Sequence, residues 1–125
     1  MTEMLETFVR LQSTRQQVRL RFAGQGPAIF LCHESPRSSD ALLPLVKTLT
    51  DRFTCILMDT PGFGLSDPMP MSRPEIADFA TVALEAIRCL GLGPIPVYGT
   101  HTGAAIAVEA AVQSSDLVSA AILDG

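Results

Sequence analysis

The sequence predicts an α/β fold in which a mostly parallel sheet carries helices on both faces. Short apolar runs bounded by glycine or proline recur along the chain, and such runs are typical of strands that are covered on both faces. Helical patterns separate the later runs, as they do in βαβ units. The 125 residues contain no repeat and no interdomain linker, so we expect a single domain.

The composition excludes several classes of protein. Hydrophobic residues make up 47% of the chain and charged residues 18%, which indicates a globular protein. The net charge of −4 argues against nucleic acid as a partner, and no apolar run is long enough to span a membrane. Cys32, Cys55 and Cys89 are widely spaced and predict buried thiols in a reducing compartment rather than a metal site. We therefore expect a cytoplasmic protein.

The first half of the chain predicts a hairpin followed by a β-α-β unit. Residues 8–13 and 17–23 alternate loosely between apolar and polar side chains, which favours antiparallel strands with one solvated face. The apolar runs 28–32 and 54–58 predict buried strands. Between them, residues 41–49 have a helical pattern.

The clearest helix is expected from about Pro74 to Leu90. Ser72 and Glu75 have the spacing of a capping box, and proline is favoured in a first helical turn. Apolar residues then recur at helical spacing on one face. Gly91 is expected to end this helix in a left-handed conformation.

The most informative segment joins a strand at residues 94–98 to an alanine-rich helix at residues 104–112. Gly99 and Gly103 frame the junction as Gly-x-x-x-Gly. A strand that passes directly into a helix needs a sharp turn, and residues without a Cβ atom let the two backbones approach closely. The middle residue is then pushed outward, as in a nucleophile elbow. His101 occupies this position, where serine, cysteine or aspartate is expected.

With these residues in view, the chain resembles the N-terminal half of an α/β-hydrolase-fold protein. Residues 31–36 match the H-G-x-P oxyanion loop, with Glu34 in place of glycine. Residues 59–67 match the D-x-P-G-x-G-x-S-D loop, which is the most specific of the motifs, and residues 99–103 match the elbow. The sequence looks most like a bacterial subgroup that pairs an H-x-S-P loop with a G-x-H-T-G elbow.

The resemblance also implies what surrounds these motifs in the family. Family members continue beyond the strand at residues 117–123 into a cap region, two further strands, a catalytic acid and a catalytic histidine. Residues 1–125 are therefore expected to be the N-terminal part of one α/β-hydrolase domain, truncated after the strand that follows the elbow helix. The expected partners are a small-molecule substrate and the missing C-terminal half or a second chain. Alone, the chain would leave an apolar strand edge open and is not expected to form a stable monomer.

His101 has three interpretations. A neutral imidazole exposes its lone pair near pH 7 without help from a base, so His101 is a candidate nucleophile. It is equally a candidate general base that acts on water. In the third interpretation the site is degenerate and only binds a ligand. The positive end of the helix dipole favours the neutral ring that the first two interpretations require.

By motif alignment, the backbone N–H groups of Ser35 and Thr102 are expected to form the oxyanion hole. The Thr102 hydroxyl either adds to this hole or caps the helix. Glu34 would repel the developing negative charge unless it is protonated or turned away. It could instead orient His101 through a ring N–H, as a carboxylate does in a catalytic triad, or face solvent as an ordinary loop residue.

The remaining site residues are predicted to be structural. His33 is expected to brace the oxyanion loop, and Asp59 to fix its own loop through turn hydrogen bonds. Together these residues predict a hydrolase that acts on a small neutral or acidic organic substrate without a metal or organic cofactor. The alternatives are a non-catalytic small-molecule binding protein, and a lyase or cofactor-free oxygenase on the same scaffold.

Overall fold

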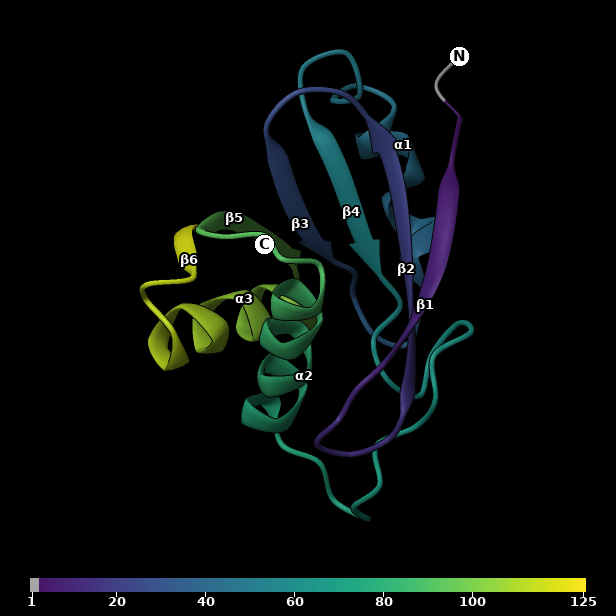
Figure 1. Ribbon diagram of the computed structural model, residues 1–125, viewed down its shortest axis with the longest axis vertical. Coiled ribbons are helices and arrows are strands. Elements are labelled where there is room, and N and C mark those ends of the chain that lie inside the picture. The colour runs from purple at the N-terminus through teal and green to yellow at the C-terminus, as the bar shows by residue number, and fades with distance from the viewer. Residues whose placement is uncertain (1–2) are drawn as a thin grey trace.

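A computed structural model describes residues 3–125, which form a mixed sheet with helices on both faces (Figure 1). The strands are β1 (Leu5–Arg10), β2 (Gln17–Gly24), β3 (Ala28–Cys32), β4 (Thr54–Met58), β5 (Ile95–Thr100) and β6 (Val118–Asp124). The helices are the 3₁₀ turn η1 (Ser39–Leu42), α1 (Leu43–Val46), α2 (Ile76–Cys89) and α3 (Thr102–Gln113). The predicted α/β class is confirmed.

The order of the strands places the site. The sheet runs β1-β2-β4-β3-β5-β6, with β1, β2 and β4 paired antiparallel and all pairs from β4 to β6 parallel. After β3 the chain moves to one side of that strand to form β4, and after β4 it returns to the other side to form β5. The sheet therefore has a topological switch point between β3 and β5. Ligands of open α/β sheets bind at such a point, outside the carboxyl ends of the strands.

Alternate residues of the central strands build a core on each face. On β3, Phe30 and Cys32 belong to the core that packs under α2 and α3. Ile29 and Leu31 belong to a second core, together with Leu42 and Val46 from the opposite helical layer. This alternation explains why the strands read as continuous apolar runs. Cys32 and Cys55 are buried as predicted, whereas Cys89, which we predicted to be buried, is exposed.

Two predicted helix boundaries are wrong. Residues 41–49 form η1 and then a single α-helical turn, because Pro44 lacks an N–H group and is tolerated only in the first turn. The capping box of α2 is formed by Glu75 and Asp78, not by Ser72 and Glu75. The Glu75 N–H donates to Asp78 Oδ2 over 2.7 Å, and the helix starts at Ile76. At its other end, Gly91 has the predicted positive φ, 70°.

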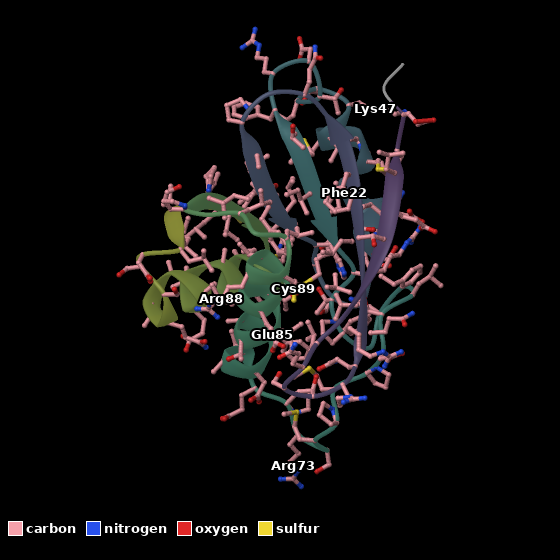
Figure 2. The ribbon with its side chains drawn as sticks, viewed as in Figure 1. Phe22, Lys47, Arg73, Glu85, Arg88 and Cys89 are labelled. Atoms are coloured by element: carbon pink, nitrogen blue, oxygen red, sulfur yellow. The ribbon has the colours of Figure 1, made fainter. Side chains whose placement is uncertain are left out.

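The predicted hairpin is present, but its first strand lies three residues earlier than expected, at Leu5–Arg10. Leu11 begins the turn, where its N–H donates to the Gln16 carbonyl oxygen over 2.9 Å, and its side chain is fully buried in the same core as residues of α2. The turn is connected to α2 by Glu85, which accepts hydrogen bonds from the N–H groups of Gln12 and Ser13 and from the Ser13 hydroxyl. Figure 2 labels Glu85 on α2.

At the far edge of the described sheet, β6 leaves apolar side chains exposed. Ile122 and Leu123 are 43% and 53% exposed, as the predicted open edge requires. None of the helices formed by residues 3–125 combines the length and the apolar character that a membrane crossing requires.

Candidate active site

The junction between β5 and α3 is a strained strand-to-helix turn. His101 has φ 54° and ψ −117°, a combination that residues with a Cβ atom rarely adopt. A Cβ atom on Gly99 would collide with the Gly103 carbonyl, and one on Gly103 would collide with the Cys32 carbonyl. The two glycines thus allow β5, α3 and β3 to approach closely, and the structure places His101 at the tip of the turn that the sequence predicts.

The His101 side chain is 59% exposed and faces a carboxylate from the loop after β3. Its Nε2 atom lies 3.8 Å from Glu34 Oε2, which is within ion-pair range but longer than a hydrogen bond. The other oxygen of Glu34 lies 3.7 Å from Arg37 Nη1. Glu34 therefore lies between the imidazole and a guanidinium, within ion-pair range of both side chains.

The two predicted oxyanion donors lie together, but they differ in what they bind. The Ser35 N–H donates a hydrogen bond of 2.7 Å to Thr102 Oγ1. Thr102 is the first residue of α3, where a backbone N–H has no acceptor within the helix. His101 occupies the N-cap position, so the alternative role of Thr102 as the helix cap is wrong.

His33 braces the loop after β3 from below. Its side chain is buried, its Nε2 atom accepts a hydrogen bond of 2.9 Å from the Thr60 N–H, and its Nδ1 atom lies 2.7 Å from the Glu34 carbonyl oxygen. These partners fix the tautomer that carries its proton on Nδ1. Burial lowers the pKa of His33 and keeps the ring neutral. The ring thus joins the ends of β3 and β4, as the predicted structural role requires.

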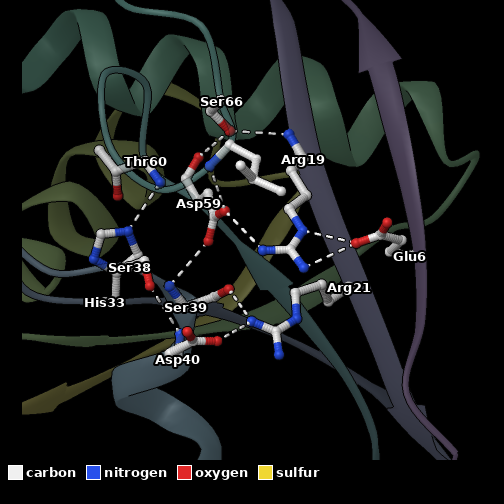
Figure 3. A network of polar contacts seen from close by, with 11 residues as sticks. Glu6, Arg19, Arg21, His33, Ser38, Ser39, Asp40, Asp59, Thr60 and Ser66 are labelled. Carbon is white, nitrogen blue, oxygen red and sulfur yellow. Dashed lines mark hydrogen bonds and ion pairs between the residues drawn. The ribbon is translucent and has the colours of Figure 1, made fainter.

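Asp59 is the centre of a polar network at the end of β4 (Figure 3). Its fully buried carboxylate accepts hydrogen bonds from the N–H groups of Ser39 and Leu65, at 2.9 and 3.0 Å, and pairs with Arg19 Nη1 at 3.3 Å. Arg19 also pairs with Glu6 on β1. Burial alone would raise the pKa of Asp59, but the hydrogen bonds outweigh it and hold the pKa below its ordinary value.

We expect Asp59→Asn to destabilise the protein by about 3 kcal/mol at pH 7, because it removes one charge of a buried, hydrogen-bonded pair. The pKa of Asp59 is depressed on folding, so its contribution is complete above the unfolded value of about 3.9 and is lost as the pH falls through the lower, folded value. Urea unfolding of both forms from pH 7 to pH 3 should therefore show their difference shrinking. Asp67→Asn is the control, because Asp67 accepts one backbone hydrogen bond but is exposed. Equal losses for the two variants would contradict the buried network.

The sequence analysis missed the contribution of Asp124, the last residue of β6. Its carbonyl oxygen accepts a hydrogen bond of 3.2 Å from the His101 N–H, and its carboxylate accepts one of 2.7 Å from the Tyr98 hydroxyl. Burial and this carboxylate raise the pKa of Tyr98 to about 12. The register between β5 and β6 would have revealed this contact, because their parallel pairing aligns Thr100 with Asp124 and places the end of β6 beside the elbow.

Two hollows are relevant to ligand binding. One of about 390 Å³ borders the oxyanion loop and is lined by Pro36, Arg37, Ser38, Asp40, Ala41 and Gly64. The other, of about 520 Å³, lies between the β1–β2 hairpin and α1, and neither of these two hollows is lined by a predicted site residue. Only the first of the two borders the loop that carries Glu34 and Ser35. Within residues 3–125, no cluster of His, Cys, Asp or Glu side chains could hold a metal ion.

An elbow beside an oxyanion-type loop, at the switch point of a mostly parallel sheet, defines an α/β-hydrolase-type site. The family model described as "alpha/beta hydrolase fold" matches residues 27–125. The chain belongs to this family.

Named relatives in this family are hydrolases. The chain is 33% identical over 111 residues to haloalkane dehalogenase 2 of Mycobacterium tuberculosis, covering 89% of this chain and 39% of that protein. It is 36% identical over 109 residues to 2-(acetamidomethylene)succinate hydrolase of Mesorhizobium japonicum, covering 87% of this chain and 39% of that protein. A crystal structure of E-2-(acetamidomethylene)succinate hydrolase matches with a TM-score of 0.86 and 33% identity, covering 95% of this chain and 43% of that one. The chain thus spans well under half the length of these relatives.

Proposed function

We propose that this chain carries the elbow of a hydrolase that cleaves a small organic substrate without a cofactor, with His101 as the reacting group. The conformation of His101 is the observation that carries the proposal. A residue at φ 54° costs of the order of 1–3 kcal/mol, and proteins tend to keep such strain where function needs it. The strain here presents a mostly exposed imidazole at the carboxyl end of β5. The hydrolase activities of the named relatives support the same class of reaction.

The position of Glu34 suggests how the ring works. A carboxylate near Nε2 favours the tautomer that carries its proton there, which leaves the lone pair on Nδ1. With a carbonyl substrate, that lone pair can bond to the acyl carbon as the leaving group departs, and water then hydrolyses the acyl-imidazole. Alternatively, it takes a proton from a water molecule that attacks the same carbon, and passes this proton to the departing group. In both routes negative charge develops on the substrate beside Ser35 and Thr102, the proposed oxyanion hole at the start of α3.

The hollow beside the oxyanion loop suggests the kind of substrate. Its volume of about 390 Å³ suits a small molecule, and Arg37 in its lining can bind a carboxylate. One named relative hydrolyses an acetamidomethylene succinate, so small acidic substrates are included in the proposal beside neutral ones.

The test is a panel of substrates offered to the complete natural protein: 4-nitrophenyl acetate, a short bromoalkane and an N-acetyl enamine dicarboxylate. We expect turnover of at least one. Rapid quenching followed by peptide mass spectrometry separates the two routes, because a nucleophile leaves an adduct on the His101 peptide and a general base does not. Binding of panel members without turnover of any would contradict the proposal and favour a binding protein.

Glu34→Gln should slow turnover by at least about tenfold and shift the pH–rate profile, because the amide cannot orient and stabilise the ring as a carboxylate does. Glu34→Gly, which restores the ordinary loop of the family, should have the same defect if Glu34 is the partner of His101. Glu109→Gln makes the same change in charge on α3 and serves as the control. A Glu34→Gly variant with natural activity and an unchanged pH profile would reduce Glu34 to a loop residue.

A further inference from the structure

We propose that the side-chain hydroxyl of Thr102 is an oxyanion donor, and that the Ser35 N–H positions this hydroxyl instead of binding the substrate oxygen itself. The inference rests on the proposed hydrolase function and changes the expected role of Ser35 within it. The oxyanion hole then consists of two donors from a single residue, the amide and the hydroxyl of Thr102.

The Ser35 N–H is already occupied. A backbone amide has one proton, and this one points at Thr102 Oγ1 over 2.7 Å, at the short end of the range for an N–H···O hydrogen bond. While that bond persists, the amide cannot donate to a substrate. The motif alignment that nominates Ser35 as a donor therefore overlooks its acceptor in this chain.

The Thr102 hydroxyl has an unused proton. A hydroxyl carries one donor and two acceptor sites, and the hydrogen bond from Ser35 fills one acceptor site. Within residues 3–125, the Thr102 hydroxyl donates to no other group, and the residue is exposed. Accepting a hydrogen bond polarises the O–H group and makes it a stronger donor. The proton is therefore free for a ligand beside His101.

The surrounding backbone holds this arrangement in place. The start of α3 presses against the end of β3 so closely that a Cβ atom on Gly103 would collide with the Cys32 carbonyl. The distance between the Ser35 amide and Thr102 is thus set by backbone packing. Threonine is branched at Cβ and has few favoured rotamers, which further fixes the hydroxyl.

The hydroxyl acts without giving up its proton. As the bond to the attacking atom forms, the π electrons of the substrate carbonyl move onto its oxygen. The Thr102 O–H and N–H groups donate hydrogen bonds to that oxygen, and the charge returns to carbon when the leaving group departs.

The test compares Thr102→Val with Thr102→Ser in the complete natural protein, with 4-nitrophenyl acetate as the probe. The valine variant keeps the shape of the side chain and removes the hydroxyl, so we expect kcat to fall about 100-fold with little change in KM. The kcat of the serine variant should stay within a few-fold of that of the natural protein. Both variants should have the same urea midpoint of unfolding as the natural protein. With the matching thionoester, whose sulfur is a weak acceptor, the loss in the valine variant should be much smaller.

Two kinetic results would overturn the inference. Higher activity in Thr102→Val would mean that the hydroxyl merely blocks the Ser35 amide. Equal losses with the oxygen ester and the thionoester would assign Thr102 a structural role.

A binding measurement decides the inference even if the protein hydrolyses no ester, in which case the proposed function fails separately. Acetate is titrated while the amide NMR resonances are followed. In the natural protein we expect a large shift of the Thr102 amide resonance and only a small one at the Ser35 amide, which keeps its Thr102 acceptor. In Thr102→Val the Ser35 amide loses its acceptor and should respond as well. A shift of the Ser35 amide in the natural protein as large as that in Thr102→Val, or no shift at Thr102, contradicts the inference.

Discussion

Replacement of His101 by alanine should lower kcat of the complete protein by about 10³-fold, within the range that a positioned proton-transfer group contributes. Stability should change by less than about 0.5 kcal/mol, because the side chain is 59% exposed and its closest charged contact, to Glu34, is longer than a hydrogen bond. Steady-state kinetics and urea unfolding of the same preparation measure both effects. Unchanged turnover would remove His101 from the reaction.

Two further substitutions at this position separate chemistry from conformation. His101→Gly should be as inactive as the alanine variant but more stable by about 1 kcal/mol, since glycine accepts φ 54° without strain. His101→Ser places a hydroxyl at the elbow, and it should hydrolyse esters only if the complete protein supplies a base for it. A glycine variant less stable than the alanine variant would contradict the strain that we assign to the elbow.

Gly99→Ala and Gly103→Ala should each cost more than about 3 kcal/mol of stability. In both, the new Cβ atom meets backbone rather than a flexible side chain, so β5, α3 or β3 must move. Gly103→Ala should also separate Ser35 from Thr102, because it pushes the start of α3 away from β3. Urea unfolding, or the loss of soluble protein, measures the effect.

Gly91→Ala is a contrasting control, because it tests the same added methyl group where no backbone lies nearby. Gly91 has a positive φ, 70°, which Gly99 and Gly103 do not have, but a Cβ atom there would meet nothing within 4 Å. Its cost should be limited to backbone strain of about 1–2 kcal/mol. If Gly99→Ala and Gly103→Ala cost no more than this control, the close packing of the elbow is not what the glycines provide.

The fold class and the elbow could be predicted because they depend on local patterns. Apolar runs of strand length indicate strands that are buried on both faces. Gly99 and Gly103 indicate a close approach of backbones, and this inference needs no knowledge of the rest of the fold. The start of α2 could not be predicted in the same way. Two pairs have the spacing of a capping box, Ser72 with Glu75 and Glu75 with Asp78. Which pair forms depends on the backbone conformation of the preceding loop.

The contacts within the site were predictable only in part. Two motifs nominate Glu34, Ser35, Thr102 and His101, but the hydrogen bond between Ser35 and Thr102 joins residues 67 positions apart. It follows from the parallel register that pairs Cys32 with Gly99, and no local pattern encodes that register. Asp124 was missed for the same reason, since only the pairing of β5 with β6 brings it to the elbow.

The most direct test of the assignment of His101 is its site-resolved modification with diethyl pyrocarbonate, which acylates accessible, neutral imidazoles. Of the two histidines in residues 1–125, His33 is protected by burial and by contacts at both ring nitrogens, and peptide mapping separates His101 from any other histidine of the complete protein. In the complete protein we expect the lost fraction of activity to equal the modified fraction of the His101 peptide. Hydroxylamine should remove the modification and restore the activity to the same extent. Full activity in protein whose His101 is completely modified would contradict the assignment.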